Sequence, residues 1–144
     1  MDAPQPAGPV LLFDGECGLC QRLVGLLLRL DRAGRLRFAP LQGPAAQAFL
    51  RSHRLPTRSF SSLVFVPDWS RRARADFRLR TDGVIGALRC LGAGGRMAAG
   101  ALRLAPAPLR DLAYRAVARV RHRLFGPWRP RPPARPEWAA RFLE

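Results

Sequence analysis

The sequence predicts an α/β domain, with a central mixed sheet of about four strands flanked by helices and an added C-terminal amphipathic helix. Three observations lead to this fold class. A short apolar run ends at an Asp-Gly turn and continues into a leucine-rich helical segment, further short apolar runs alternate with helical segments, and the last long segment has apolar residues at helical spacing. This order is typical of a sheet that is covered by helices.

The first half of the chain predicts a strand–helix–strand unit. Val10–Phe13 is a continuous apolar run, as expected for a buried central strand. A helix is predicted over Cys17–Leu30, and the alternating residues Arg35–Ala39 predict a second strand parallel to the first. A short helix follows over Pro44–Arg51, because proline suits the first turn of a helix.

The second half predicts two more strands and a helix. Ser61–Val66 is apolar enough for a core strand. Alternating arginine and apolar residues in Ala73–Leu79 predict a half-exposed edge strand, antiparallel to its predecessor. Thr81 or Asp82 can cap a helix that reaches Leu91, and glycines then lead into a weaker helical segment.

The helix after Pro106 is clearly amphipathic, and its arginines lie off the apolar face. A basic amphipathic helix can dock on a membrane surface. We favour packing of the apolar face against the sheet, because this face has no large anchoring side chain before Phe125. The residues that share the face are Leu109, Leu112, Ala113, Ala116, Val117, Val120 and Leu124.

The chain has 144 residues, which suits one domain. We expect a loose arm over residues 1–8, the domain over 9–126, and a tail rich in proline and arginine over 127–144. The prolines of the tail exclude a helix over most of its length. A last short helical turn is expected to dock on the domain through Trp138 and Phe142.

The Cys-x-x-Cys pair that follows the first strand is the most informative motif. Cys17 falls in the first turn of the predicted helix, where unpaired backbone N–H groups and the helix dipole favour negative charge. A thiol there loses its proton more readily, and the thiolate is the reactive form. Cys17 is therefore the candidate nucleophile, and Cys20, one turn deeper, is the candidate resolving thiol.

Asp14 and Gly15 lie between the strand and the dithiol. The Asp14 carboxylate can accept or relay the proton of Cys20, or it can simply shape the Asp-Gly turn. Gly15 is expected to have a positive φ.

A zinc site is the other chemistry that a Cys-x-x-Cys pair suggests, but it needs a second pair or spaced histidines. The chain adds only Cys90, His53 and His122, which are scattered and lack ligand spacing. We expect Cys90 to be a filler or spare thiol and both histidines to lie at the surface. The prediction is a redox dithiol that needs no metal or cofactor.

Phe13-Asp14-Gly15-x-Cys17-x-x-Cys20 resembles the opening signature of the DCC family, which is named for its Asp-Cys-Cys arrangement. A second block, from Pro106 through Arg110, Asp111 and Tyr114 to Gly126, resembles the end of that family's domain. The resemblance implies a thioredoxin-like fold and a thiol-disulfide oxidoreductase. It also implies a supporting role for Asp14.

Two further residues are supporting candidates. Thioredoxin-like folds place a cis-proline opposite the dithiol, and Pro56, before the third strand, is the candidate for this role. Asp111 suits the first turn of its helix, and Arg110 can bridge to a neighbouring element. A place for Arg110 near the thiols is implied by the resemblance alone.

All 25 basic residues are arginine, against 10 acidic residues, so the net charge is +15. Because the arginines are scattered and few aromatic residues accompany them, we do not expect nucleic acid to be the partner. The expected client is a disulfide-containing protein or a small thiol. The alternative function is a basic module that binds nucleic acid or an acidic partner, with the Cys-x-x-Cys pair as redox sensor or structural pair.

The sequence also bears on the compartment. No apolar run approaches the ~20 residues that cross a bilayer, and the N-terminus lacks the basic region of a signal peptide. Three cysteines do not form a disulfide framework. We therefore expect a cytoplasmic protein, in which the dithiol cycles.

Overall fold

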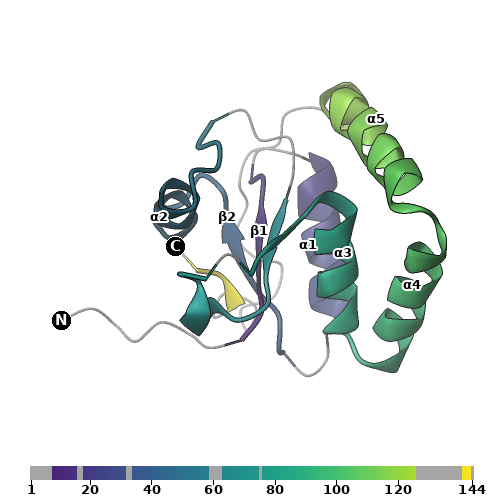
Figure 1. Ribbon diagram of the computed structural model, residues 1–144, viewed down its shortest axis with the longest axis horizontal. Helices are drawn as coiled ribbons and strands as arrows, with labels where there is room; N and C mark the ends of the chain where they lie inside the picture. Colours follow the sequence, from purple (N-terminus) through teal and green to yellow (C-terminus); the bar gives the residue numbers. More distant parts are fainter. Residues whose placement is uncertain are drawn as a thin grey trace.

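The computed structural model describes residues 8–15, 18–31, 34–58, 63–74, 76–125 and 141–143. These ranges contain a four-stranded mixed sheet and five α-helices, consistent with a thioredoxin-like fold, so the predicted α/β class is confirmed (Figure 1). The elements are β1 (Val10–Phe13), α1 (Gly18–Leu30), β2 (Arg37–Pro40), α2 (Pro44–Ser52), β3 (Val64–Val66), the 3-10 turn η1 (Trp69–Arg71), β4 (Arg78–Leu79), α3 (Arg80–Arg89), α4 (Ala93–Leu104) and α5 (Ala107–Phe125).

The strand order is β2-β1-β3-β4. β1 pairs with β2 in parallel, with Val10 opposite Arg37, which confirms the predicted strand–helix–strand unit. β1 pairs with β3 in antiparallel fashion, with Leu12 opposite Val64. The carboxyl end of β1 and the start of β3 therefore lie at the same edge of the sheet.

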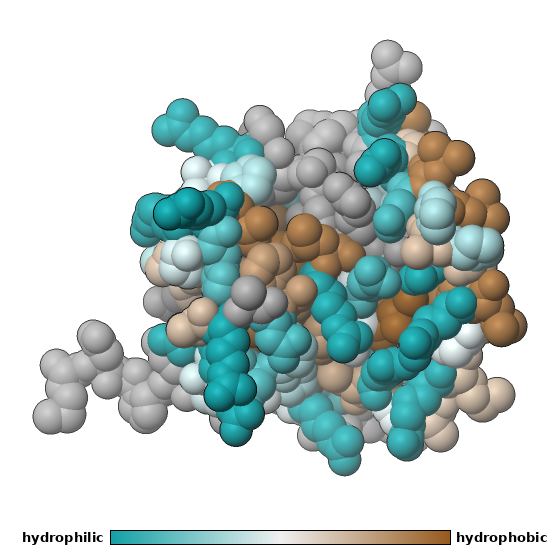
Figure 2. All heavy atoms as spheres, viewed as in Figure 1, coloured by the Kyte–Doolittle hydropathy of each residue, from teal (hydrophilic) through white to brown (hydrophobic). Residues whose placement is uncertain are grey.

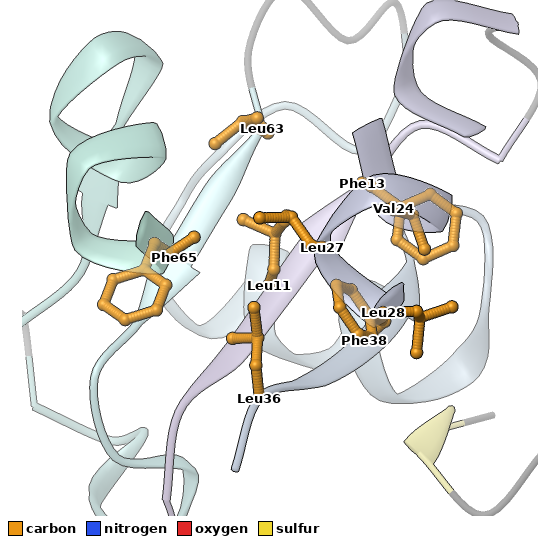
Figure 3. Close-up of a cluster of buried hydrophobic side chains, with 10 residues drawn as sticks. Leu11, Phe13, Val24, Leu27, Leu28, Leu36, Phe38, Leu63 and Phe65 are labelled. Atoms are coloured by element: carbon orange, nitrogen blue, oxygen red, sulfur yellow. The ribbon is translucent and has the colours of Figure 1, made fainter. Parts of the chain in front are cut away.

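Side chains of β1 alternate between two hydrophobic clusters, one on each face of the sheet. Leu11 and Phe13 pack with α1 and α3, and Figure 3 shows this cluster with Leu27 of α1 beside the sheet. Val10 and Leu12 belong to the cluster that α2 covers on the opposite face (Figure 1). The strand is buried on both faces, as its continuous apolar run predicts.

The predicted strand over residues 73–79 is wrong in its extent, because Arg78 and Leu79 are the only described residues of this segment that pair with β3. The chain first turns inward at η1, where the Asp68 side chain accepts hydrogen bonds from Ser70 N and Oγ at 3.1 and 2.7 Å. This turn buries Trp69 against the ring of Phe49, with centroids 5.7 Å apart. The register of β4, with Phe65 opposite Arg78, leaves the residues before Arg78 to connect the two strands.

Helix α3 begins at Arg80, with Leu79 as its N-cap and no side-chain capping bond, so the predicted cap at Thr81 or Asp82 is wrong. Asp82 lies in the first turn instead, where the helix dipole favours a carboxylate. The helix packs closely on the sheet: a Cβ at Gly86 would lie 2.5 Å from the Phe65 ring.

Helix α5 forms as predicted, but the predicted packing of its apolar face against the sheet is wrong. Leu109 and Leu112 are 58% and 64% exposed. α5 contacts α1 and α3, and α4 and α5 lie beyond these helices, away from the sheet (Figure 1). In the described part of the chain, no helix combines the length and apolar character needed to span a membrane.

The segment 141–143 packs beside β2. Phe142 forms an isolated parallel bridge with Phe38, and its ring lies 6.2 Å from that of Phe13 in edge-on geometry. Leu143 N donates to Phe38 O at 2.7 Å. The predicted docking of Phe142 is confirmed, whereas Trp138 and most of the predicted arm and tail lie outside the described residues.

Candidate functional site

The candidate site begins where β1 ends. Asp14 directly follows the buried strand and is itself buried, as is Gly15. The pairing of β1 with β2 continues to this point, since Leu41 N donates to Phe13 O at 2.7 Å. The Asp-Gly pair is thus held at the edge of the sheet, immediately before the dithiol.

Gln42, in the turn after β2, holds both residues of this pair. Its Nε2 donates to Asp14 Oδ1 at 2.7 Å, and its Oε1 accepts from Gly15 N at 3.0 Å. The sequence analysis missed Gln42, which lies 28 positions from Asp14. The parallel pairing of β1 and β2 was the available signal, because it brings the turns after both strands to one edge.

The expected positive φ at Gly15 is wrong: among the described glycines, the positive values belong to Gly8, Gly34 and Gly92. A glycine fits at position 15 for another reason. A Cβ there would lie 3.1 Å from Gln42 Oε1 and 3.4 Å from the Pro40 side chain. The absence of a side chain lets Gln42 approach the backbone.

Helix α1 is joined to the same turn. Gln21 Nε2 donates to Gly15 O at 2.9 Å, which ties the start of the helix to the end of β1. Cys20 lies in the first turn of α1, is half-buried and packs against the cluster on that face of the sheet. Cys17 lies outside the described residues, and α1 begins at the next residue in the sequence, Gly18.

Replacing Gln42 is expected to loosen this turn. In Gln42→Ala, Asp14 Oδ1 and Gly15 N each lose a hydrogen bond, so we expect the free energy of unfolding to fall by about 1–2 kcal/mol. Urea unfolding measures this change. Gln42→Glu is the sharper variant, because it keeps the acceptor but replaces the donor with a carboxylate beside Asp14. Wild-type stability of Gln42→Glu would show that the bond to Asp14 contributes nothing.

Pro56 and Arg110 were the two supporting candidates, and none of the described contacts places either of them at this turn. Pro56 is exposed and its preceding peptide bond is trans, so the expectation of a cis-proline is wrong. Arg110 donates to Asp82 Oδ1 on α3 at 3.3 Å and to Ala105 O at 3.1 Å. Arg110 therefore joins α5 to α3, which is the bridging role expected of it.

Tyr114 links α5 to the edge of the sheet that carries Asp14. Its hydroxyl accepts a hydrogen bond from Leu63 N at 3.0 Å. Leu63 is one residue before Val64, which pairs with Leu12, so Leu63 lies beside Phe13 and next to Asp14 in the sheet. Tyr114 belongs to the sequence block that runs from Pro106 to Gly126. This block is thus connected to the edge of the sheet at which the block from Phe13 to Cys20 begins.

Cys90 and His53 contribute to packing rather than to this turn. Cys90 is half-buried against the hydrophobic cluster, which agrees with its expected role as a filler. His53 was expected at the surface, but it is half-buried: its Nε2 contacts Arg72 O at 2.6 Å and its ring lies 4.4 Å from that of Phe49.

Cys90 is expected to react slowly with alkylating agents. Burial raises the pKa of its thiol, the Asp31 carboxylate raises this pKa further, and Arg35 acts in the opposite direction. The fraction of thiolate at neutral pH is therefore small, and labelling increases only in alkaline solution. Timed alkylation with mass mapping measures the three cysteines separately, and denatured protein is the control. Labelling of Cys90 before Cys17 would contradict this prediction.

An α/β fold with a Cys-x-x-Cys pair where the first helix begins, after the first strand, is typical of thiol-disulfide redox proteins. The family model described as DCC1-like thiol-disulfide oxidoreductase matches residues 11–127. The chain belongs to this family.

Two curated proteins are similar to this chain over most of its length. The uncharacterized protein YuxK of Bacillus subtilis is 32% identical over 126 residues, which are 88% of this chain and 87% of that protein. The chloroplastic DCC family protein At1g52590 of Arabidopsis thaliana is 32% identical over 119 residues, 82% of this chain and 65% of that protein. No solved structure matches the chain.

Proposed function

We propose that this protein is an enzyme that reduces or exchanges disulfides, with Cys17 as nucleophile and Cys20 as resolving thiol. One observation carries most of the argument: Gln21 and Gln42 hold the turn between β1 and α1 at Gly15. This turn sets Cys20 in the first turn of α1, and the sequence places Cys17 immediately before that helix. Family membership supports the same chemistry.

The first step is attack of the Cys17 thiolate on one sulfur of the client disulfide. A Cys17–client bond forms, the client S–S bond breaks, and the second client sulfur leaves as a thiolate that takes up a proton. Unpaired N–H groups at the start of α1 favour the negative charge that Cys17 needs for this attack.

In the second step Cys20 loses its proton and attacks Cys17. The Cys17–Cys20 disulfide forms and the mixed disulfide breaks, so the client leaves fully reduced. An external dithiol must then reduce the enzyme for another turnover. Asp14 is the proposed acceptor for the Cys20 proton, because a buried carboxylate sits at the end of β1, directly before the dithiol turn.

The proposed client is a disulfide-containing protein or a small disulfide of a thiol compound. Helix α1 carries the exposed Arg22 and Arg29 and no acidic residue, which suits acidic clients. A reducing compartment such as the cytoplasm suits a dithiol that must return to its reduced form.

The proposal is tested by turnover of a disulfide substrate with an added dithiol as reductant. The purified protein is expected to turn over repeatedly, and Cys90→Ser, which alters a thiol outside the proposed site, is the matched control with unchanged rate. A wild-type rate no greater than that of the dithiol alone would remove the enzyme proposal and favour a binding role.

A further inference from the structure

The outer surface of α4 and α5 is apolar. Met97 and Leu104 of α4 are 76% and 87% exposed, and Leu109 and Leu112 of α5 are also more than half exposed. Val117 and Val120 continue the exposed apolar surface along α5. Figure 2 shows hydrophobic residues gathered along the side of the molecule that α4 and α5 form.

The orientation of α5 causes this exposure. Arg110 and Tyr114 lie on the side that faces the domain, where they bond to Asp82 and to the backbone of Leu63. Leu109 and Leu112 lie on the opposite side of the helical turn. An amphipathic helix normally buries its apolar face, whereas α5 is bonded to the domain through Arg110 and Tyr114 and leaves much of its apolar face exposed.

Positive charge surrounds this surface. Residues 93–125 contain seven arginines and one acidic residue, Asp111, so the net charge of the segment is 7 − 1 = +6 with histidine neutral. Arg96, Arg103, Arg115 and Arg119 are exposed beside the apolar side chains. The surface therefore combines apolar anchors with arginine at its margins.

We propose that the α4–α5 surface docks on an anionic membrane, with both helices lying in the interface between lipid headgroups and acyl chains. Apolar side chains on one face of a helix and basic residues at its margins are the features that bind such an interface. A second copy of this chain is a poorer occupant, since it would bring two strongly positive surfaces together. An anionic bilayer buries the exposed apolar side chains and attracts the positive charge of the arginines at the same time.

Docking also orients the candidate site. Tyr114 ties α5 to Leu63, which lies at the edge of the sheet next to Asp14. This hydrogen bond fixes the position of that edge relative to the docked helix, and the protein would act on clients at a membrane surface.

The test is co-sedimentation of the full-length protein with lipid vesicles. We expect binding to vesicles that mix phosphatidylcholine with phosphatidylglycerol and little binding to phosphatidylcholine alone. The double variant Leu109→Ser/Leu112→Ser is expected to lower the partition coefficient roughly tenfold or more, because it removes two apolar anchors. Arg115→Gln/Arg119→Gln is expected to lower it by a similar factor and to reduce its salt dependence.

Arg51→Gln/Arg58→Gln is the matched control. It removes the same charge from two exposed positions, one in α2, which covers the other face of the sheet (Figure 1), and one after this helix, and is expected to retain binding. Circular dichroism checks that each variant is folded. Three results would overturn the proposal: equal binding to both kinds of vesicle, unchanged binding of the leucine variant, or an equal loss in the control. A dimer that the leucine variant abolishes, without vesicle binding by the parent, would assign the surface to self-association instead.

Discussion

Cys17→Ser is expected to reduce disulfide exchange to the uncatalysed rate while the fold stays intact. Without Cys17 no thiolate precedes α1, so no covalent intermediate forms with the client. Cys20→Ser is expected to behave differently: attack by Cys17 still occurs, but no second thiol displaces the client. The mixed disulfide then persists until an external thiol releases it.

Non-reducing gels of client-incubated variants and single-turnover rates measure these outcomes. The adduct should appear with Cys20→Ser, be absent from Cys17→Ser, and disappear on reduction. Melting curves control for folding, and a small effect is expected because serine and cysteine have similar volumes. Full activity of Cys17→Ser would refute the proposed mechanism, and the adduct trapped by Cys20→Ser would identify the client.

Asp14→Asn separates the two proposed roles of the carboxylate. A proton acceptor for Cys20 affects the second step, so the variant should slow resolution more than attack. A residue that only shapes the turn should change neither step, because asparagine can still accept a hydrogen bond from Gln42.

The second large effect is expected at Arg141. Its guanidinium is 2.6 Å from Asp31 Oδ2 and donates to Leu36 O at 2.8 and 3.0 Å. Asp31 is only 3% exposed, and Oδ1 has no hydrogen-bond partner among the described residues. Arg141→Ala leaves a buried carboxylate without its counterion, so we expect the free energy of unfolding to fall by about 3–5 kcal/mol.

Urea unfolding of Arg141→Ala, compared with Asp82→Asn, tests this expectation. The Asp82 carboxylate is 64% exposed and pairs with Arg110 at 3.3 Å, so its neutralisation should cost no more than about 1 kcal/mol. Adding Asp31→Asn to Arg141→Ala should recover part of the lost stability, because the buried charge is removed. Equal effects of Arg141→Ala and Asp82→Asn would show that segment 141–143 does not stabilise the domain.

Most of the secondary structure and the central unit of the fold follow from local sequence patterns. The apolar run Val10–Phe13, the leucine-rich segment before Leu30 and the spacing in α5 each specify an element within a few residues. The Asp-Gly turn and the Cys-x-x-Cys pair likewise define the candidate site from sequence, because these residues are close together and their chemistry depends on local position. The predicted helices and strands were largely confirmed, whereas the local predictions of a positive φ at Gly15 and of a cap at Thr81 or Asp82 were wrong.

Contacts between distant residues were decided by tertiary structure. Gln42 holds Asp14 from 28 positions away, and Arg141 reaches Asp31 across 110 positions. The register of β4 against β3 similarly leaves a strand of two residues, Arg78 and Leu79, where a longer one was predicted. No periodic pattern encodes such pairings, because they depend on how separate elements approach one another.

The orientation of α5 shows most clearly what the sequence determines and what only the tertiary structure determines. Its spacing of leucines and valines identifies an apolar face, because helical periodicity places those residues on one side. Which side the domain covers depends on the bonds of Arg110 to Asp82 and of Tyr114 to Leu63. These bonds turn Arg110 and Tyr114 toward the domain and leave Leu109 and Leu112 exposed. Periodicity alone determines that α5 has two faces, and only the packing of α5 against the domain determines which face meets the surroundings.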